Sequence, residues 1–284
     1  MKVDYISDLH VDHTFVKVEG VNERGIRRVY DDVFRTKDSD ILIIAGDTAN
    51  SVVIGAEFIK QATELYGYKR VFVVTGNHEM YMTSQSQDSR YKTSYNKLKV
   101  FKDSFKGCPH ISVLDGEVEE YKGIVFGGAM GWYDTSYDDN VYQKMPHMYS
   151  MKSTIPINKY WQQVMNDSRF IKPITGDYRD ISTIERAKVV KAITTGPDVM
   201  ITHICPITSD SMVHSQYKGT RDNTFYMFDG EELVEEYKPK FWIYGHQHIS
   251  MSTKAYDTEL LINPHGYPNE NRRPQVKTFE INKE

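Results

Sequence analysis

Five of the ten histidines in this 284-residue chain stand at the ends of short apolar runs, beside carboxylate, amide and glycine residues. In chain order these polar clusters read Asp8-Leu9-His10, Gly46-Asp47, Gly76-Asn77-His78-Glu79, His203 and Gly245-His246-Gln247-His248. Side chains two positions apart on extended backbone face the same way. Asp8 and His10 can therefore bind at one site, and so can His246 and His248. Glycines beside the ligands let the backbone turn sharply. The pattern predicts a metal centre built from five separate segments.

Each cluster has an ordinary explanation when it is taken singly, since a Gly-Asp pair is usually a turn and a lone histidine is usually a core or surface residue. The five together are different, because burying so many imidazoles and carboxylates side by side without a cation carries a large desolvation cost. Carboxylate, amide and imidazole donors without a thiolate suit Mn, Fe, Co, Ni or Zn, and Mn is the first choice. Two such ions ~3.5 to 4 Å apart can hold a bridging hydroxide and stabilise in-line displacement at phosphorus.

The segments that must position these clusters alternate between strand and helix patterns. Short β-branched or aromatic runs predict buried strands at 41–44, 71–74, 199–201 and 241–244, and helical spacing predicts helices at 55–68 and 182–194. This alternation indicates an α/β fold, in which ligands gather at the strand ends. Consecutive strands are also expected at 252–255, 260–263 and 275–281, in a second, partly antiparallel sheet, and at 112–114, 117–121 and 124–126, as a meander.

The composition of the chain narrows the classes of protein to which it can belong. Apolar residues make up 39% and charged residues 26% of the chain, which indicates a globular protein, and the net charge of −4 gives no overall basic field for nucleic acid. Only two cysteines occur, Cys108 and Cys205, which favours a reducing, cytoplasmic setting. No signal peptide or membrane-spanning run is indicated. The number of subunits is left open.

The ordered motifs resemble those of the calcineurin-like metallophosphoesterase superfamily, over almost the whole chain. The resemblance implies a four-layer α/β/β/α sandwich of two mixed β-sheets flanked by helices, with a dinuclear metal centre at the sheet edge. In that pattern Asp47 bridges two metals. The other implied ligands are Asp8, His10 and His248 for one metal, and Asn77, His203 and His246 for the second.

The resemblance also implies that His78 is the catalytic acid, which protonates the leaving alkoxide or stabilises charge on the phosphoryl oxygens. Glu79 is interpreted as a fold-supporting group. In the protein Ser/Thr phosphatase branch the Gly-Asp motif continues into a second Asp and an Arg-Gly pair, whereas here Asp47 is followed by Thr48-Ala49-Asn50. Protein phosphatase activity is therefore disfavoured.

Residues 130–180 interrupt the strand and helix rhythm and are rich in Tyr, Met and Trp. We expect one domain over residues 1–284 with an inserted, lid-like segment at about 130–180, the alternative being a surface insertion without a role in the chemistry. Residues 127–134, 165–169 and 263–268 resemble a superfamily branch found in bacteria and their phages. Trp132 is expected to stack on a substrate ring, and Asn166 and Arg169 to bind substrate, against the alternatives of a core Trp and a surface Arg.

The function expected from these features is hydrolysis of a phosphomonoester or phosphodiester by a dinuclear-metal-dependent phosphoesterase. The substrate would be a small phosphorylated metabolite or a nucleotide. The alternative is a nuclease or nucleic-acid end-processing phosphatase, and a less favoured alternative is a non-catalytic metal-binding interaction protein. Turnover is favoured over the last of these because every ligand position and the acid histidine are filled.

Overall fold

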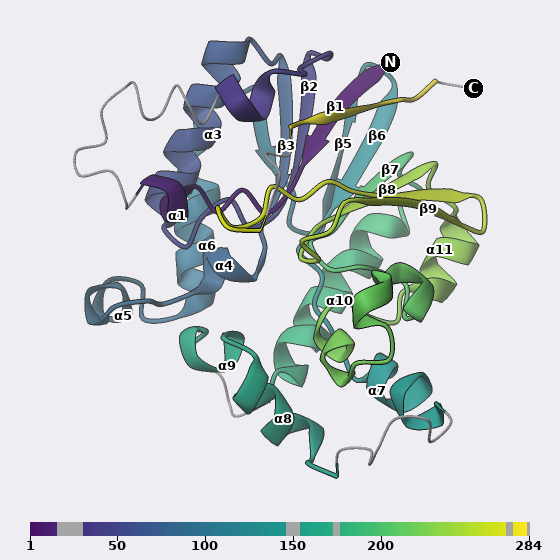
Figure 1. Ribbon diagram of the computed structural model, residues 1–284. Coiled ribbons are helices and arrows are strands. Elements are labelled where there is room, and N and C mark those ends of the chain that lie inside the picture. Colours follow the sequence, from purple (N-terminus) through teal and green to yellow (C-terminus); the bar gives the residue numbers. More distant parts are fainter. Residues whose placement is uncertain (16–30, 146–153, 173–176, 271–274, 283–284) are drawn as a thin grey trace.

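Two β-sheets lie face to face at the centre of the protein and helices cover their outer faces (Figure 1). The computed structural model describes residues 1–15, 31–145, 154–172, 177–270 and 275–282. The predicted α/β fold, a four-layer sandwich of two mixed sheets flanked by helices, is confirmed. In the part of the chain described, no helix is long and apolar enough to cross a membrane.

The first sheet has the strand order β11-β1-β2-β3-β4. Its strands are β1 (Lys2–Ile6), β2 (Ile41–Ala45), β3 (Arg70–Val74), β4 (Ile111–Val113) and β11 (Lys277–Glu280). The first four run parallel, and β11 pairs antiparallel with β1. Every residue of β2 and β3 is buried, as expected for parallel strands that are covered on both faces.

The second sheet has the strand order β5-β6-β7-β8-β10-β9. Its strands are β5 (Glu117–Tyr121), β6 (Ile124–Gly128), β7 (Val199–Ile201), β8 (Phe241–Tyr244), β9 (Met251–Ala255) and β10 (Thr258–Ile262). Strands β6, β7, β8 and β10 are parallel, while β5 and β9 lie antiparallel at the edges. The parallel strands of both sheets can therefore bring their carboxyl ends to a shared edge.

Two expected strand groupings are wrong, although the strands themselves are present. The strand near 112–114 pairs with β3 in the first sheet instead of starting a meander with β5 and β6. Likewise, β11 pairs with β1 instead of following β9 and β10 in the second sheet. The reason is that a short apolar run is equally suited to either sheet, and the choice depends on partners far away in the chain.

Four long or well-packed helices form the outer layers. Helices α3 (Val52–Tyr66) and α6 (Ser94–Asp103) cover the first sheet, and α10 (Arg179–Ile193) and α11 (Glu231–Tyr237) lie on the other side (Figure 1). Between the sheets, the rings of Phe72 and Phe126 stack with centroids 4.3 Å apart. Three apolar cores, one in each space between layers, hold the strands in place.

Helix α3 starts three residues before the expected position, because Ser51 caps it by accepting a hydrogen bond from the Ile54 N–H. The other α-helices are α1 (Val11–Phe15), α4 (Asn77–Met80), α5 (Gln85–Tyr91), α7 (Ser136–Asn140), α8 (Ile157–Val164) and α9 (Asp167–Phe170). Short 3₁₀ helices are η1 (Tyr142–Lys144), η2 (Asp210–Met212), η3 (Ser215–Tyr217) and η4 (Arg221–Phe225). Within the expected insertion, residues 146–153 and 173–176 lie outside the described residues.

Candidate metal centre

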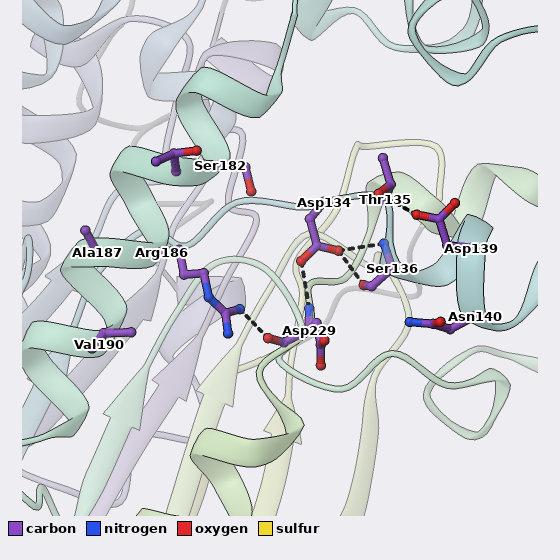
Figure 2. Close-up of a pocket in the computed structure, with 11 residues that line it drawn as sticks. Asp134, Thr135, Ser136, Asp139, Asn140, Ser182, Arg186, Ala187, Val190 and Asp229 are labelled. Carbon is purple, nitrogen blue, oxygen red and sulfur yellow. Dashed lines mark hydrogen bonds between the residues drawn. The ribbon is translucent and has the colours of Figure 1, made fainter.

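Two hollows among the described residues are candidate sites. The first, of about 810 Å³, lies between α10 and the segment around Asp134 (Figure 2). Its Asp134 carboxylate already accepts hydrogen bonds from the N–H groups of Ser136 and Asp229, and Arg186 donates to the Asp229 carbonyl. None of the expected ligands lines this hollow. The second hollow, of about 610 Å³, contains Asp47, Asn77, His78, His246 and His248, and it is the candidate active site.

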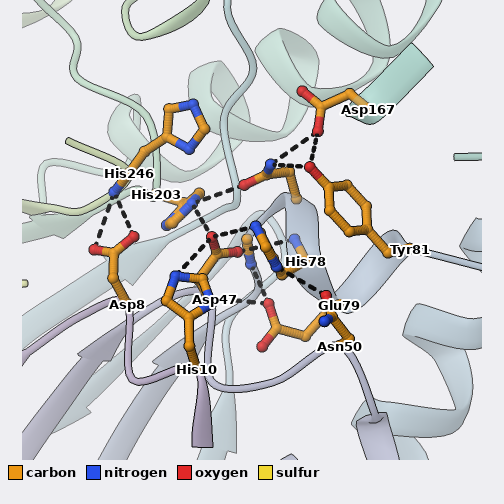
Figure 3. Close-up of polar contacts among 12 residues, drawn as sticks. Asp8, His10, Asp47, Asn50, His78, Glu79, Tyr81, Asp167, His203 and His246 are labelled. Atoms are coloured by element: carbon orange, nitrogen blue, oxygen red, sulfur yellow. Dashed lines mark hydrogen bonds and ion pairs between the residues drawn. The ribbon is translucent and has the colours of Figure 1, made fainter. Parts of the chain in front are cut away.

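All seven expected ligands converge where parallel strands of both sheets end. Asp8, His10, Asp47, His203 and His246 are labelled in Figure 3. Strands β1, β2 and β3 of the first sheet lead into the first three motifs, and β7 and β8 of the second sheet lead into the last two. Three groups of side chains have ligand atoms that all lie within 4.8 Å of one another: Asp8, His10 and His248; His10, Asp47 and His78; and Asp47, His203 and His246.

The backbone at these strand ends is strained in a way that turns the ligands inward. Among the described residues, eight other than glycine have a positive φ, and four of them are expected ligands. Their φ values are 52° at Asp8, 42° at His10, 55° at Asp47 and 67° at His246. Residues with side chains seldom adopt this region, and such strain persists where the surrounding structure holds it, commonly at functional sites.

Asp47 occupies the middle of the cluster. Its Oδ2 lies 3.3 Å from His203 Nε2 and 3.9 Å from His10 Nε2, and its Oδ1 accepts the His78 backbone N–H at 2.9 Å. Burial opposes ionisation of the Asp47 carboxyl, but the charges of His203 and His78 outweigh it and hold the Asp47 pKa well below its ordinary value. One carboxylate therefore faces both groups of ligands.

Partners outside the cluster fix which ring nitrogen each histidine turns towards the site. The Nδ1–H of His203 donates to the Ala45 carbonyl at 2.9 Å, and the Nε2–H of His246 donates to the Phe225 carbonyl at 3.1 Å. For His248, Nδ1 bonds to the Glu270 carboxylate at 2.5 Å. Since carbonyl and carboxylate oxygens accept hydrogen bonds, each ring turns its other nitrogen towards the site, where the neutral form of the ring can ligate a metal.

The arrangement fits a bound cation. His10 Nε2 and His248 Nε2 face each other at 3.2 Å, and the buried His10 Nδ1 has no hydrogen-bond partner among the described residues. Burial, followed by the charge of His78, lowers the His10 pKa well below its ordinary value, so this ring is neutral and able to ligate. Neutral imidazoles and ionised carboxylates are the forms that bind transition metals.

His78 has a partner that the sequence did not reveal. Its Nδ1 lies 2.8 Å from Asn50 Oδ1, and its Nε2 lies 3.1 Å from the hydroxyl of Tyr267. Asn50 thus stands where another branch of the superfamily is expected to supply an acid. Tyr267 also stacks on His10, with ring centroids 4.4 Å apart. The only sequence signal for Tyr267 was its place within residues 263–268.

Glu79 holds two ligand loops together, in agreement with its interpretation as a fold-supporting residue. Its carboxylate accepts the backbone N–H groups of Gly76 at 2.7 Å, Asp47 at 3.1 Å, Thr48 at 2.6 Å and Ala49 at 3.2 Å. Because the side chain is 1% exposed, these four bonds replace water for both loops.

The three expected substrate-binding residues are placed differently from one another. Asn166 is exposed and lines the cavity. Arg169 is exposed on α9 but does not line the cavity. Trp132 is 2% exposed and packs on Tyr133 with ring centroids 4.7 Å apart, so the expectation that it stacks on substrate is wrong. Its ring belongs to the apolar core beneath the second sheet, a role that its sequence context suits equally well.

The cavity has walls from three parts of the chain outside the ligand loops. One wall is the end of α8 and the start of α9, a second is the segment from Val213 to Tyr226, and a third carries Tyr267 and Glu270. Val164 and Tyr217, from the first two walls, are 41% and 48% exposed. The acidic residues Asp222 and Glu270 also line it. The opening is therefore partly apolar and partly acidic.

A sandwich with a cluster of histidines and carboxylates at its strand ends fits a metal-dependent hydrolase acting on phosphoester bonds. The chain belongs to the calcineurin-like phosphoesterase family, whose family model matches residues 1–250. Members of this family use divalent metal ions.

Solved structures share the fold. A phosphopantetheinyl hydrolase from Mycobacterium tuberculosis is similar with a TM-score of 0.67 and 16% sequence identity, over 97% of this chain and 95% of that chain. A second solved structure is similar with a TM-score of 0.51 and 13% identity, over 98% of both chains. A search of curated protein sequences found no match.

Proposed function

We propose that the protein is a dinuclear-metal-dependent phosphoesterase that hydrolyses a small phosphomonoester or phosphodiester by in-line attack of water. The observation that carries this proposal is the position of Asp47, whose Oδ2 lies 3.3 Å from a histidine of one group and 3.9 Å from a histidine of the other. A carboxylate between two ligand groups is suited to bridging two ions. When bound, the two ions activate water and neutralise the phosphoryl oxygens.

The proposed ligand set follows the two groups of side chains around Asp47. Asp8, His10 and His248 hold one ion, and Asn77, His203 and His246 hold the other. The mixture of oxygen and imidazole donors supports Mn as the first ion to test, followed by Fe, Zn, Co and Ni.

His78 is the proposed general acid. Its Nδ1–H donates to Asn50 Oδ1, so its Nε2 faces the cavity, where it delivers a proton to the leaving alkoxide. Asn50 orients the ring but adds no negative charge. Tyr267, whose hydroxyl lies 3.1 Å from His78 Nε2, holds the ring from the cavity side.

A substrate with one phosphoryl group and an uncharged organic part suits the cavity best. Val164 and Tyr217 offer apolar contact, whereas Asp222 and Glu270 repel additional phosphates. These acidic walls disfavour the alternative of a nuclease. The fold likeness to a phosphopantetheinyl hydrolase makes a pantetheine-type phosphoester a sensible addition to the assay.

The inserted segment 130–180 is proposed to serve as the wall over this cavity, through α8 and Asn166, within a single domain of residues 1–284. The two cysteines, Cys108 and Cys205, are free, which supports the proposal of a cytoplasmic enzyme. A bacterial or phage type is proposed from the resemblance of residues 127–134, 165–169 and 263–268.

The proposal is tested by metal analysis of Asp47→Ala after loading with Mn²⁺, alongside turnover of an aryl phosphate, an aryl phosphodiester and single-stranded DNA. Wild type is expected to hold two ions and to cleave the small esters, and Asp47→Ala is expected to hold neither ion. The matched control is Asp222→Ala, which removes a cavity-wall carboxylate outside the ligand set and should keep both ions. A wild type that binds one ion or none, or an active Asp47→Ala variant, would refute the proposal.

A further inference from the structure

A buried carboxylate from the inserted segment reaches the proposed metal centre. Asp167, at the start of α9, has no exposed surface. Its Oδ1 accepts hydrogen bonds from Asn77 Nδ2 at 2.8 Å and from the Tyr81 hydroxyl at 2.6 Å (Figure 3). Its Oδ2 accepts the Tyr133 hydroxyl at 2.6 Å. All three donors are neutral, so hydrogen bonds hold the carboxylate in place beside the proposed metal centre.

The network extends further into α8. The Tyr133 oxygen accepts a hydrogen bond from Trp161 Nε1 at 2.6 Å, and Trp161 is 1% exposed. This places the Tyr133 hydroxyl hydrogen on the side of Asp167. The position of the carboxylate is thus fixed by buried aromatic side chains, one of which lies within α8.

The carboxylate decides which end of the Asn77 amide faces the metal centre. A carboxylate only accepts hydrogen bonds, so the amide must turn its NH₂ group towards Asp167. The amide oxygen then points the other way, where Asn77 Oδ1 lies 3.1 Å from His203 Nε2. The flipped amide would bring its oxygen against the carboxylate and leave a buried repulsive contact. An amide binds a metal through its oxygen, so the orientation held by Asp167 is the one that can ligate.

We propose that Asp167 is a positioning residue for the metal centre: it presents Asn77 Oδ1 to one of the two ions, and it makes α9 of the inserted segment part of that ion's site. The inference rests on the proposed function, because it takes Asn77 as a ligand. A group that orients a metal ligand in this way typically changes metal affinity ~10 to 100-fold when it is removed.

The test is Mn²⁺ binding by calorimetry, with electron paramagnetic resonance to detect a pair of coupled ions. Asp167→Ala should weaken one of the two ions ~10 to 100-fold and abolish the coupled signal at limiting metal, while the other ion binds as in wild type. Asp167→Asn keeps an acceptor oxygen and should restore most of the affinity. Tyr133→Phe removes the bond to Oδ2 but leaves the contact with Asn77, and it should have a much smaller effect.

Asn77→Ala is the reference variant, because it distinguishes a failure of the positioning role of Asp167 from a failure of the proposed ligand set. If Asn77→Ala loses one ion while Asp167→Ala binds both as tightly as wild type, the positioning role is overturned and the proposed function stands. If Asn77→Ala keeps both ions, the proposed ligand set is wrong and the inference falls with it. Equal loss of both ions in Asp167→Ala and Asp167→Asn would show a general packing effect and would also overturn it. Should Asp167→Ala fail to fold, Asp167→Leu fills the space without an acceptor and the same loss of one ion is expected.

Discussion

A buried lysine near the proposed metal centre gives the sharpest test of how burial shifts a pKa in this protein. Lys97, on α6, has no exposed surface, and its Nζ donates hydrogen bonds to the backbone carbonyls of Asn50 and Tyr81. Asn50 orients His78, and Tyr81 bonds to Asp167. Lys97 therefore links the loop that contains Asn50 to the loop that contains Tyr81. Burial lowers the Lys97 pKa from 10.5 to about 8, although the charge of Glu79 opposes this shift.

The free energy of unfolding depends on pH because Lys97 releases its proton at a lower pH in the folded protein than in the unfolded chain. Below pH 8 both the folded and the unfolded protein hold the Lys97 proton, and the folded protein carries the full cost of burying the charge. As the pH rises from 8 towards 10.5, the folded protein releases the proton while the unfolded chain still binds it, so folding becomes more favourable. Over this whole pH range the free energy of unfolding rises by about 3 kcal/mol, and about 2 kcal/mol of that gain is reached by pH 9.5.

Lys97→Met keeps most of the length of the side chain and removes the titrating group. At pH 7 the variant loses two hydrogen bonds from a charged donor, worth about 1.5 to 3 kcal/mol each, but it also escapes a burial cost of about 3 kcal/mol. The free energy of unfolding at pH 7 should therefore fall by only about 0 to 3 kcal/mol. Between pH 7 and pH 9.5 wild type should gain about 2 kcal/mol relative to the variant.

The measurement is urea unfolding of metal-free protein at several values of pH, followed by circular dichroism. The matched control is Lys99→Met, which removes an exposed lysine from the same helix and should leave the pH dependence unchanged. A difference between wild type and Lys97→Met that is the same at pH 7 and pH 9.5 would refute the reasoning, because it would mean that the lysine is not desolvated.

Two further predictions concern the chemical step and the backbone of the site. His78→Ala should keep both ions but lower kcat by ~10² to 10⁴ for esters with poor leaving groups. The loss should be much smaller for aryl esters, because their leaving groups need little protonation. Equal losses of kcat for both kinds of ester would argue against the acid role. Gly76→Ala should abolish metal binding, because a Cβ there would lie 2.2 Å from Asp47 Oδ1, and metal analysis of the purified variant checks this. Gly55→Ala is its control, since a Cβ at Gly55 meets its nearest neighbour at an ordinary 3.5 Å, and unchanged metal content in both variants would contradict the prediction.

The sequence by itself determined the strands and the residues that follow them. Runs such as 41–44 and 71–74 are too short and too apolar for anything but buried strands, and parallel strands place their carboxyl ends together. Asp47, Asn77 and His203 could therefore be assigned to one site before the fold was known. These features are local, because each polar residue stands within a few positions of the strand that carries it.

The tertiary structure alone decided what those residues contact. Asn50 reaches His78 across 28 positions, Asp167 reaches Asn77 across 90, and Tyr267 reaches His78 across 189. The tertiary structure also decided that β4 and β11 belong to the first sheet and that the ring of Trp132 lies in the core. Contacts between distant segments depend on how the layers pack, and neither hydrophobic periodicity nor a short motif carries that information.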